Sequence, residues 1–597
     1  MADLKPLPAH LTGGSFLLEE IDPKHIFTPE ELSSELRQMA ETAEKFMDKE
    51  VLSQIEALEH QEAGLAVQAF KKAGAIGLLG GEVPEDYGGL GLGKVAAIGV
   101  SEQLTRLGGF GVTCGAHSGI ATQPLVYFGT SEQKKKYLPR LATGEWMAAY
   151  CLSEPASGSD ALAMRTKATL TPDGKSYVLS GTKMWISNAG WADLFTVFAK
   201  VDGLHVTAFL VERTAPGLSV GKEEHKLGIK TSSTRRVILE EVTVSKEQVL
   251  GEVGKGAYIA FNILNFGRFG LGAGAVGAAK DSLRSATRYA GERVQFGKPL
   301  SSFGLIQQKL GDMAAKIYAA ESAVYRTAAM IDSVLETGEL MDSMTPAFPR
   351  GLDEFALECS IIKVACSETL DRVVDECLQI HGGYGYTEEF PAARAYRDAR
   401  INRIFEGTNE INRLFIPGLL MRRSQRGRFP LLPAVAKIMK ELFDLTAAEE
   451  DSNPLVTGRG LLANAKKVAL FLSGAAYQKF GETLIEQQEV LAGLSDLIME
   501  VYVAESAVLR AQKNATSAGN ADIHATLAAI VINDSAARME AFARSTLSSW
   551  AEGDELKAQL GIVKRLLRWT PLNATTLRRK AAKLLSERGS YPAMLRA

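Results

Sequence analysis

The 597-residue chain has few cysteines, and they do not form a pattern that would cross-link it or bind zinc. Five are present, far apart and with no C-x-x-C pair: Cys114, Cys151, Cys359, Cys366 and Cys377. This fits neither a structural zinc site nor a secreted disulfide framework. We therefore expect a reducing compartment such as the cytoplasm or an organelle matrix.

Long apolar runs and an excess of one charge are also missing. No uncharged apolar run reaches about 18 residues, and MADLKPLPAHLTGGSF at the start lacks a basic stretch followed by an apolar one. We expect a soluble protein without an export signal. Sixty-seven Lys and Arg balance 70 Asp and Glu, so no general attraction to nucleic acid is expected. The eight histidines show no ligand spacing, and we expect no metal.

What the chain does have is ordinary globular composition, with 46% hydrophobic and 23% charged residues. Its length corresponds to several domains of about 150 residues each. The period of the apolar residues predicts a mainly α protein with an inserted β-domain. We divide it into an N-terminal extension (1–29), a helical domain (30–149), a β-domain (150–256), a helical bundle (257–426) and an extra C-terminal helical domain (427–597). SMTPAFPRG, at 343–351, is expected to be a loop because proline disrupts helices.

A dinucleotide-binding pattern, G-x-G-x-x-G, occurs at Gly272, Gly274 and Gly277. The Rossmann use of this pattern requires a preceding strand and a helix that begins at the glycines. These glycines instead lie inside a small-residue stretch with helical spacing. We expect them to allow close helix packing.

Four segments carry more information: YCLSEPASGSD (150–160), KMWISNAG (183–190), RVQFGKPLSSFGLIQQKLGDM (293–313), and QIHGGYGYTEEFP (379–391) joined to RDARINRIFEGTNEINR (397–413). In this order and at these separations, the chain resembles the acyl-CoA dehydrogenase family over about residues 30 to 420. With the extra C-terminal block it is most similar to the very-long-chain branch. The resemblance implies two helical domains around a β-barrel domain, with FAD between the β-domain and the second helical domain. It also implies oxidation of acyl-CoA to trans-2-enoyl-CoA in fatty acid β-oxidation.

Such a reaction removes a proton beside the thioester carbonyl and a hydride from the next carbon, so the site needs a base. Glu406 in IFEGTNEINR is the candidate, because burial would raise its pKa from about 4.3 toward a useful value. The alternative is a solvated acidic residue before a helix that starts at Thr408. A few relatives carry the base just before the arginine that is Arg268 here, and this chain has Gly267 at that position.

The resemblance also implies the cofactor contacts. Residues matching the flavin-ring contacts are Tyr150, Leu152, Ser153, Trp185, Ser187 and Thr408. Residues matching the adenylate and diphosphate contacts, partly from a neighbouring subunit, are Arg293, Gln295, Phe296, Gln379, Gly382 and Gly383. The alternative for Tyr150 and Trp185 is a place in the β-domain core.

On the substrate side, Ser159 and Arg268 match positions near the thioester and CoA, although a buried arginine could instead pair with a carboxylate. The segment FGVTCGAHSGIATQP (110–124) matches the helix that closes the acyl tunnel in medium-chain relatives. Its small residues Gly115 and Ala116 would leave room for long chains. The alternative is that they serve close helix packing.

The resemblance further implies electron-transfer flavoprotein as the electron acceptor, and a homodimer whose C-terminal block covers the surface that pairs dimers in tetrameric relatives. Residues 557–597 hold ten Lys or Arg against one acid, Glu587. This segment could contact anionic lipid, but we favour a solvated face that balances acidic residues elsewhere. Two other functions stay open: a catalytically weak scaffold or assembly protein, and an acyl-CoA oxidase.

Overall fold

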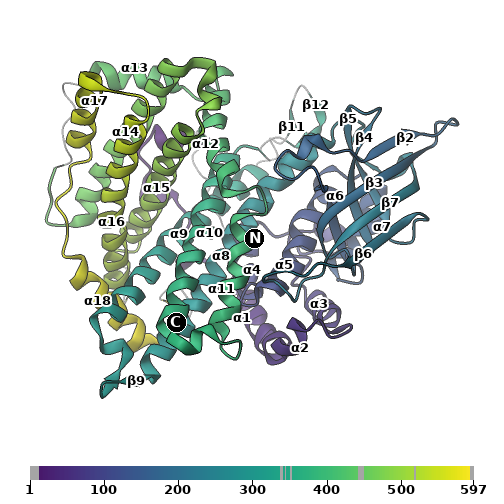
Figure 1. Cartoon of the computed structure of the whole chain (residues 1–597), viewed down its shortest axis with the longest axis horizontal. Helices are drawn as coiled ribbons and strands as arrows, with labels where there is room; N and C mark the ends of the chain where they lie inside the picture. The colour runs from purple at the N-terminus through teal and green to yellow at the C-terminus, as the bar shows by residue number, and fades with distance from the viewer. Residues whose placement is uncertain are drawn as a thin grey trace.

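Helices make up most of the chain, and one β-sheet domain is inserted between them (Figure 1). The computed structural model describes residues 12–336, 341–342, 345–349, 353–441, 449–516, 520–589 and 591. The sheet lies toward one end of the molecule and the C-terminal helices toward the other, with the long helices α8 (Gly256–Glu292), α9 (Gly304–Glu336) and α10 (Ala356–His381) between them (Figure 1). The predicted fold class is confirmed.

Short helices form the N-terminal part. Their bounds are α1 Ser34–Phe46, α2 Ile55–Glu59, α3 Leu65–Ala75, α4 Lys94–Leu104, α5 Gly108–Gly115, α6 Gln123–Phe128 and α7 Ser131–Ala142, and one π-helical turn, η7 Ala116–Ala121, follows α5. Capping side chains fix where some of them begin. The Ser33 hydroxyl accepts from the Leu36 N–H, and Thr130 and Gln133 form a reciprocal capping box before α7.

The β-domain is one eight-stranded sheet. Its strands are β1 Ala148–Cys151, β2 Lys167–Leu170, β3 Ser176–Ser187, β4 Leu194–Val201, β5 His205–Glu212, β6 Leu218–Glu223, β7 Thr234–Ser245 and β8 Val249–Leu250. The order is β6-β7-β3-β2-β4-β5-β8, and β1 pairs in parallel with β4. Strand β3 pairs antiparallel with β7, and the register shifts between Lys183 and Ile186. This bulge re-aims the end of β3.

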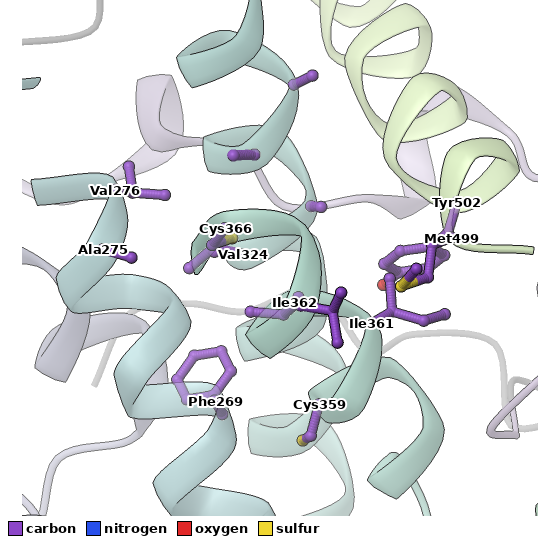
Figure 2. Close-up of a cluster of buried hydrophobic side chains, with 14 of the residues drawn as sticks. Phe269, Ala275, Val276, Val324, Cys359, Ile361, Ile362, Cys366, Met499 and Tyr502 are labelled. Atoms are coloured by element: carbon purple, nitrogen blue, oxygen red, sulfur yellow. The ribbon is translucent and has the colours of Figure 1, made fainter. Parts of the chain in front are cut away.

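The central bundle contains the longest helices: α8 Gly256–Glu292, α9 Gly304–Glu336, α10 Ala356–His381, α11 Pro391–Ala399 and α12 Asn409–Gln425. Its core joins the C-terminal domain, because Ile361 of α10 lies beside Met499 and Tyr502 of α15 (Gln488–Lys513) (Figure 2). Two small hairpins flank these helices, β9 Val294–Gln295 with β10 Lys298–Pro299, and β11 Met341–Asp342 with β12 Thr345–Pro349. The loop expected at 343–351 is therefore partly a strand, while 343–344 and 350–351 lie outside the described residues.

The three glycines of the G-x-G-x-x-G pattern lie within α8, as expected from their context. A Cβ at Gly272 would lie 2.1 Å from Ile362 Cγ2 on α10, and one at Gly277 would lie 2.4 Å from Glu102 Cα on α4. At Gly274 it would lie 2.8 Å from Thr105 Cγ2. The close-packing interpretation is correct, because no side chain fits at these positions.

The C-terminal helices are α13 Leu431–Glu441, α14 Pro454–Phe480, α15 Gln488–Lys513, α16 Ala521–Ser548, α17 Gly553–Leu566 and α18 Ala574–Arg588. Helices α15, α16 and α18 pack on α9. The N-terminal segment also contacts these helices. The buried Arg510 of α15 pairs with Glu30 of this segment and with Glu321 of α9, each at 2.6 Å. No helix in the described part of the chain is long and apolar enough to cross a membrane.

Acidic residues neutralise part of the basic C-terminal segment. Arg578 pairs with Asp312 of α9 and with Asp534 of α16, the latter at 2.6 Å. Lys580 lies 2.5 Å from Asp522. These acids come from other parts of the sequence, which supports the interpretation of this segment as a charge-balancing face.

Candidate active site

Glu406 lies on a sharp turn that ends where α12 begins. Glu406 and Gly407 both have positive φ, 58° and 78°, which is uncommon for a glutamate. The Asn412 amide holds the turn by donating to the carbonyls of Gly407 and Thr408 at 2.9 and 3.0 Å. Thr408 caps α12, since its hydroxyl accepts from the Ile411 N–H at 3.2 Å. Glu406 thus has a backbone conformation that glycine adopts readily, and the surrounding contacts hold the glutamate in it.

The Glu406 carboxyl lies in the wall of a cavity of about 280 Å³. Burial raises its pKa to about 7, and the positive charges of Arg268 and Lys363 oppose that rise. Its buried Oε2 has no hydrogen-bond partner among the described residues. An unpaired carboxylate with a pKa near neutrality has the properties of a general base.

Gly267 provides the space for this carboxyl. A Cβ at Gly267 would lie 2.5 Å from Glu406 Oε2 and 2.9 Å from Ile120 Cγ2. The position just before Arg268 is therefore directly beside the Glu406 carboxyl. Here the absence of a side chain at one position makes room for the carboxyl at the other.

Arg268 is buried on α8 and supports the same turn. Its Nε donates to the Glu406 carbonyl at 3.3 Å, and its Nη1 donates to Asn265 Oδ1 at 3.1 Å. The guanidinium lies 5.0 Å from the centre of the Phe415 ring. These contacts are to a backbone carbonyl, an amide oxygen and a ring, while the positive charge of Arg268 lowers the pKa of the Glu406 carboxyl; its match to a position near CoA stays a prediction. The other CoA-side residue, Ser159, is exposed in the loop after β1.

Sequence reasoning missed Lys363, which is fully buried on α10 and interacts electrostatically with Glu406. Its Nζ donates to Asn409 Oδ1 at 2.7 Å. Burial lowers its pKa to about 7, and the Glu406 carboxylate opposes this. The Asn409 amide also donates to Ser367 and Glu368, both at 3.1 Å. A lone lysine in the apolar run SIIKVAC was the available signal, since lysine is rarely buried without a partner.

Two of the residues predicted to contact the flavin ring, Ser187 and Tyr150, lie near Glu406. Ser187, at the end of β3, lines the same cavity. Tyr150 is buried in β1, where its hydroxyl donates to the Ala260 carbonyl at 3.4 Å. Burial, and then the Glu406 carboxylate, raise the pKa of Tyr150. Trp185 is 57% exposed at a positive φ of 62°, so it is not part of the sheet core.

Leu152 and Ser153 continue from β1 toward the β3 bulge, where the Met184 N–H donates to the Ser153 carbonyl at 2.9 Å.

The residues predicted to contact the adenylate and diphosphate lie elsewhere. Arg293 follows the last residue of α8, 26 residues beyond Gly267, which corresponds to about 39 Å of helix. Its guanidinium lies 5.6 Å from the Tyr384 ring centre, which brings it to the turn containing Gly382 and Gly383. The other three predicted residues are also exposed here: Gln295, Phe296 and Gln379. In one chain, Gly267 beside Glu406 and Arg293 beside Gly382 and Gly383 are therefore separated by almost the whole length of α8.

Small residues leave the cavity open along α5, η7 and α8. Gly115, Ala116, Gly119 and Gly270 line it. At each of these three glycines a Cβ would meet no described atom within 4 Å. Gly111 differs, since its Cβ would lie 2.7 Å from Thr105 Cγ2. Gly115 and Gly119 are therefore not required for close helix packing.

The fold and this geometry place a buried carboxyl with a raised pKa at a cavity lined largely by small and apolar side chains, an arrangement suited to removing a proton from a substrate with an apolar portion. Four segments match models of the acyl-CoA dehydrogenase family: its N-terminal domain at 33–145, its middle domain at 149–242, and two C-terminal domain models at 254–418 and 464–565. The chain belongs to the acyl-CoA dehydrogenase family.

A "Probable acyl-CoA dehydrogenase" of Bacillus subtilis (strain 168) is 44% identical over 584 residues, 97% of this chain and 98% of that protein. The mitochondrial very long-chain specific acyl-CoA dehydrogenase of Macaca fascicularis is 39% identical over 431 residues, 70% of this chain and 62% of that protein. Among solved structures, an acyl-CoA dehydrogenase complexed with FAD from Bacillus anthracis is similar with a TM-score of 0.93 and 47% identity. The match covers 97% of this chain and 100% of that one.

Proposed function

We propose that the protein is an FAD-dependent acyl-CoA dehydrogenase that uses Glu406 as its base. The observation that carries this proposal is the unpaired carboxylate, with a pKa of about 7, in the wall of a cavity lined largely by small and apolar side chains. Family membership gives the reaction, and the carboxylate supplies the group that this reaction needs.

The residues present fit FAD. The exposed Trp185 indole offers a face to cover a flavin ring, and Ser187 lies beside it at the cavity. Gly382 and Gly383 have room for the close approach of a diphosphate, and Arg293 nearby supplies a cation. When bound, FAD supplies the hydride acceptor. The Bacillus anthracis relative, whose structure is described as an FAD complex, supports this choice.

The protein's own groups account for the proton. Glu406 Oε2 accepts it from the carbon beside the thioester carbonyl. Before transfer, the cations of Arg268 and Lys363 stabilise the carboxylate, so its pKa does not rise beyond a useful value. The apolar wall excludes water from the reacting carbons, which strengthens these electrostatic interactions.

We also propose long acyl chains as the substrate class and electron-transfer flavoprotein as the acceptor. The openings beside Gly115, Gly119 and Gly270 support long chains, as does the similarity to the very long-chain specific relative. The acceptor rests on the resemblance to that branch.

The active form proposed is a homodimer in which each FAD uses the flavin-side residues of one chain and the Arg293 side of its partner. The separation of about 39 Å along α8 supports this arrangement. So does Phe296, which is 93% exposed in one chain.

The test is Glu406→Gln, which keeps the shape of the side chain and removes its basicity. Turnover should fall by at least about 10² to 10⁴, the usual effect of losing a general base, while FAD and acyl-CoA binding are retained. Anaerobic bleaching of the flavin by acyl-CoA measures the chemical step, and Glu410→Gln is the matched control because Glu410 is exposed. Activity of the Glu406 variant within tenfold of the parent would remove Glu406 as the base. A colourless parent without turnover would favour the scaffold function, and a high peroxide yield would favour an oxidase.

A further inference from the structure

A buried ion pair lies in the β-domain beside the bulge of β3. The Lys183 side chain is fully buried, and its Nζ lies 2.8 Å from Glu154 Oε1. The same Glu154 carboxylate accepts from the Thr166 N–H and hydroxyl at 3.0 and 2.5 Å, and from the Arg165 N–H at 2.6 Å. Every donor here is directed at one carboxylate, which is how a buried charge is tolerated.

Lys183 makes a second contact that the ion pair does not need. Its Nζ also donates to the Leu152 carbonyl at 3.2 Å, and the next residue along β3, Met184, donates its N–H to the Ser153 carbonyl at 2.9 Å. Two successive residues of β3 therefore hold two successive carbonyls of the segment after β1. Because the C=O and N–H of a trans peptide point in opposite directions, the bond to Leu152 directs the Ser153 N–H away from Lys183.

The bulge begins at the same residue. The β3 register shifts after Lys183, and Trp185 in the bulge has a positive φ of 62° with 57% of its surface exposed. A tryptophan in this conformation costs backbone energy and exposes apolar surface, so neighbouring contacts must maintain it. On one side of Trp185 the chain is fixed by the pairing of Ile186 and Ser187 with β7, and on the other by Lys183 and Met184, which are anchored to 152–154.

We propose that Lys183, buried against Glu154, is a positioning residue of the cofactor site. It holds the Leu152–Ser153 peptide and the bulge bearing Trp185 in one arrangement. This proposal rests on the proposed function, because it requires that Leu152, Ser153 and Trp185 face a bound flavin. Lys183 touches neither cofactor nor substrate and acts through these three residues. A purely structural ion pair would contribute to stability and leave flavin binding unaffected.

The experiment measures FAD binding to apoprotein by flavin fluorescence, together with the absorption spectrum of the bound flavin and thermal unfolding. Lys183→Met should raise the Kd for FAD at least about tenfold, the effect of losing one charge-assisted hydrogen bond, and shift the flavin spectrum. Thr166→Val is the matched control. It removes a donor to the same carboxylate but leaves both contacts to 152–153, so its Kd should stay within about twofold of the parent even where its Tm falls.

A second variant keeps the proposal testable where Lys183→Met alone folds poorly. Lys183→Met combined with Glu154→Gln leaves no unpaired buried charge and should fold more readily, yet it lacks the donor to Leu152. Its Kd should rise as for Lys183→Met. If both variants bind FAD within about twofold of the parent with an unchanged spectrum, Lys183 is structural and the proposal is wrong. A parent apoprotein that binds no FAD would instead overturn the proposed function, and this inference with it.

Discussion

Replacing Gly115 by glutamine should shorten the acyl chains that the cavity accepts. A Cβ at this position meets no described atom within 4 Å, so the new side chain enters the cavity without displacing the helices. If it denies four methylenes a dry site at about 0.8 kcal/mol each, it costs about 3 kcal/mol. This corresponds to a fall of roughly two-hundredfold in kcat/KM for long chains, whereas short chains that end before the plug are unaffected.

The assay is kcat/KM across C4 to C18 acyl-CoA with an artificial electron acceptor. We expect the parent to prefer C14 to C18 over C4 to C8 by roughly several hundredfold, from the same value per methylene. The variant should lose this preference while retaining its FAD. Gly561→Gln is the control, because Gly561 is exposed on α17 and a Cβ there also meets open space. A chain-length profile unchanged by Gly115→Gln would show that the acyl chain runs elsewhere.

Three further predictions concern the base and the assembly. Glu406 accepts a proton only as the carboxylate, and its pKa is about 7. We therefore expect kcat/KM to fall about tenfold per pH unit below pH 7 and to level off above it. A flat pH profile between pH 5 and 8 would refute this. Lys363→Met removes a cation that lowers the pKa of Glu406, so the midpoint of the pH profile should move to higher pH. A midpoint that stays or moves to lower pH would contradict this effect of Lys363 on the Glu406 pKa. Light scattering at micromolar concentration should give a dimer mass, and Phe296→Asp, at an exposed site, should shift it toward the monomer; a tetramer would contradict the prediction.

The sequence determined much of the architecture. Helical periodicity and β-branched runs distinguish the helical regions from the sheet. Each element buries one face, so the spacing of its apolar residues can be recognised within a short segment of sequence. The small-residue context of Gly272 was enough to reject a Rossmann site. Glu406 could also be proposed as the base from the sequence, since its motif stands in one continuous segment.

The tertiary structure decided what depends on residues far apart in sequence. Gly267 is significant because its missing side chain leaves room for a carboxyl 139 positions later. Lys363 and Lys183 are both fully buried, and their proposed roles depend on the groups that folding brings to them: Asn409 for Lys363, and Leu152 and Glu154 for Lys183. Glu30 and Arg510, 480 positions apart, meet in a buried ion pair. Such contacts produce no periodic pattern in the sequence. They depend on the distance between two side chains in space, and that distance is set only when all the helices and strands have packed together.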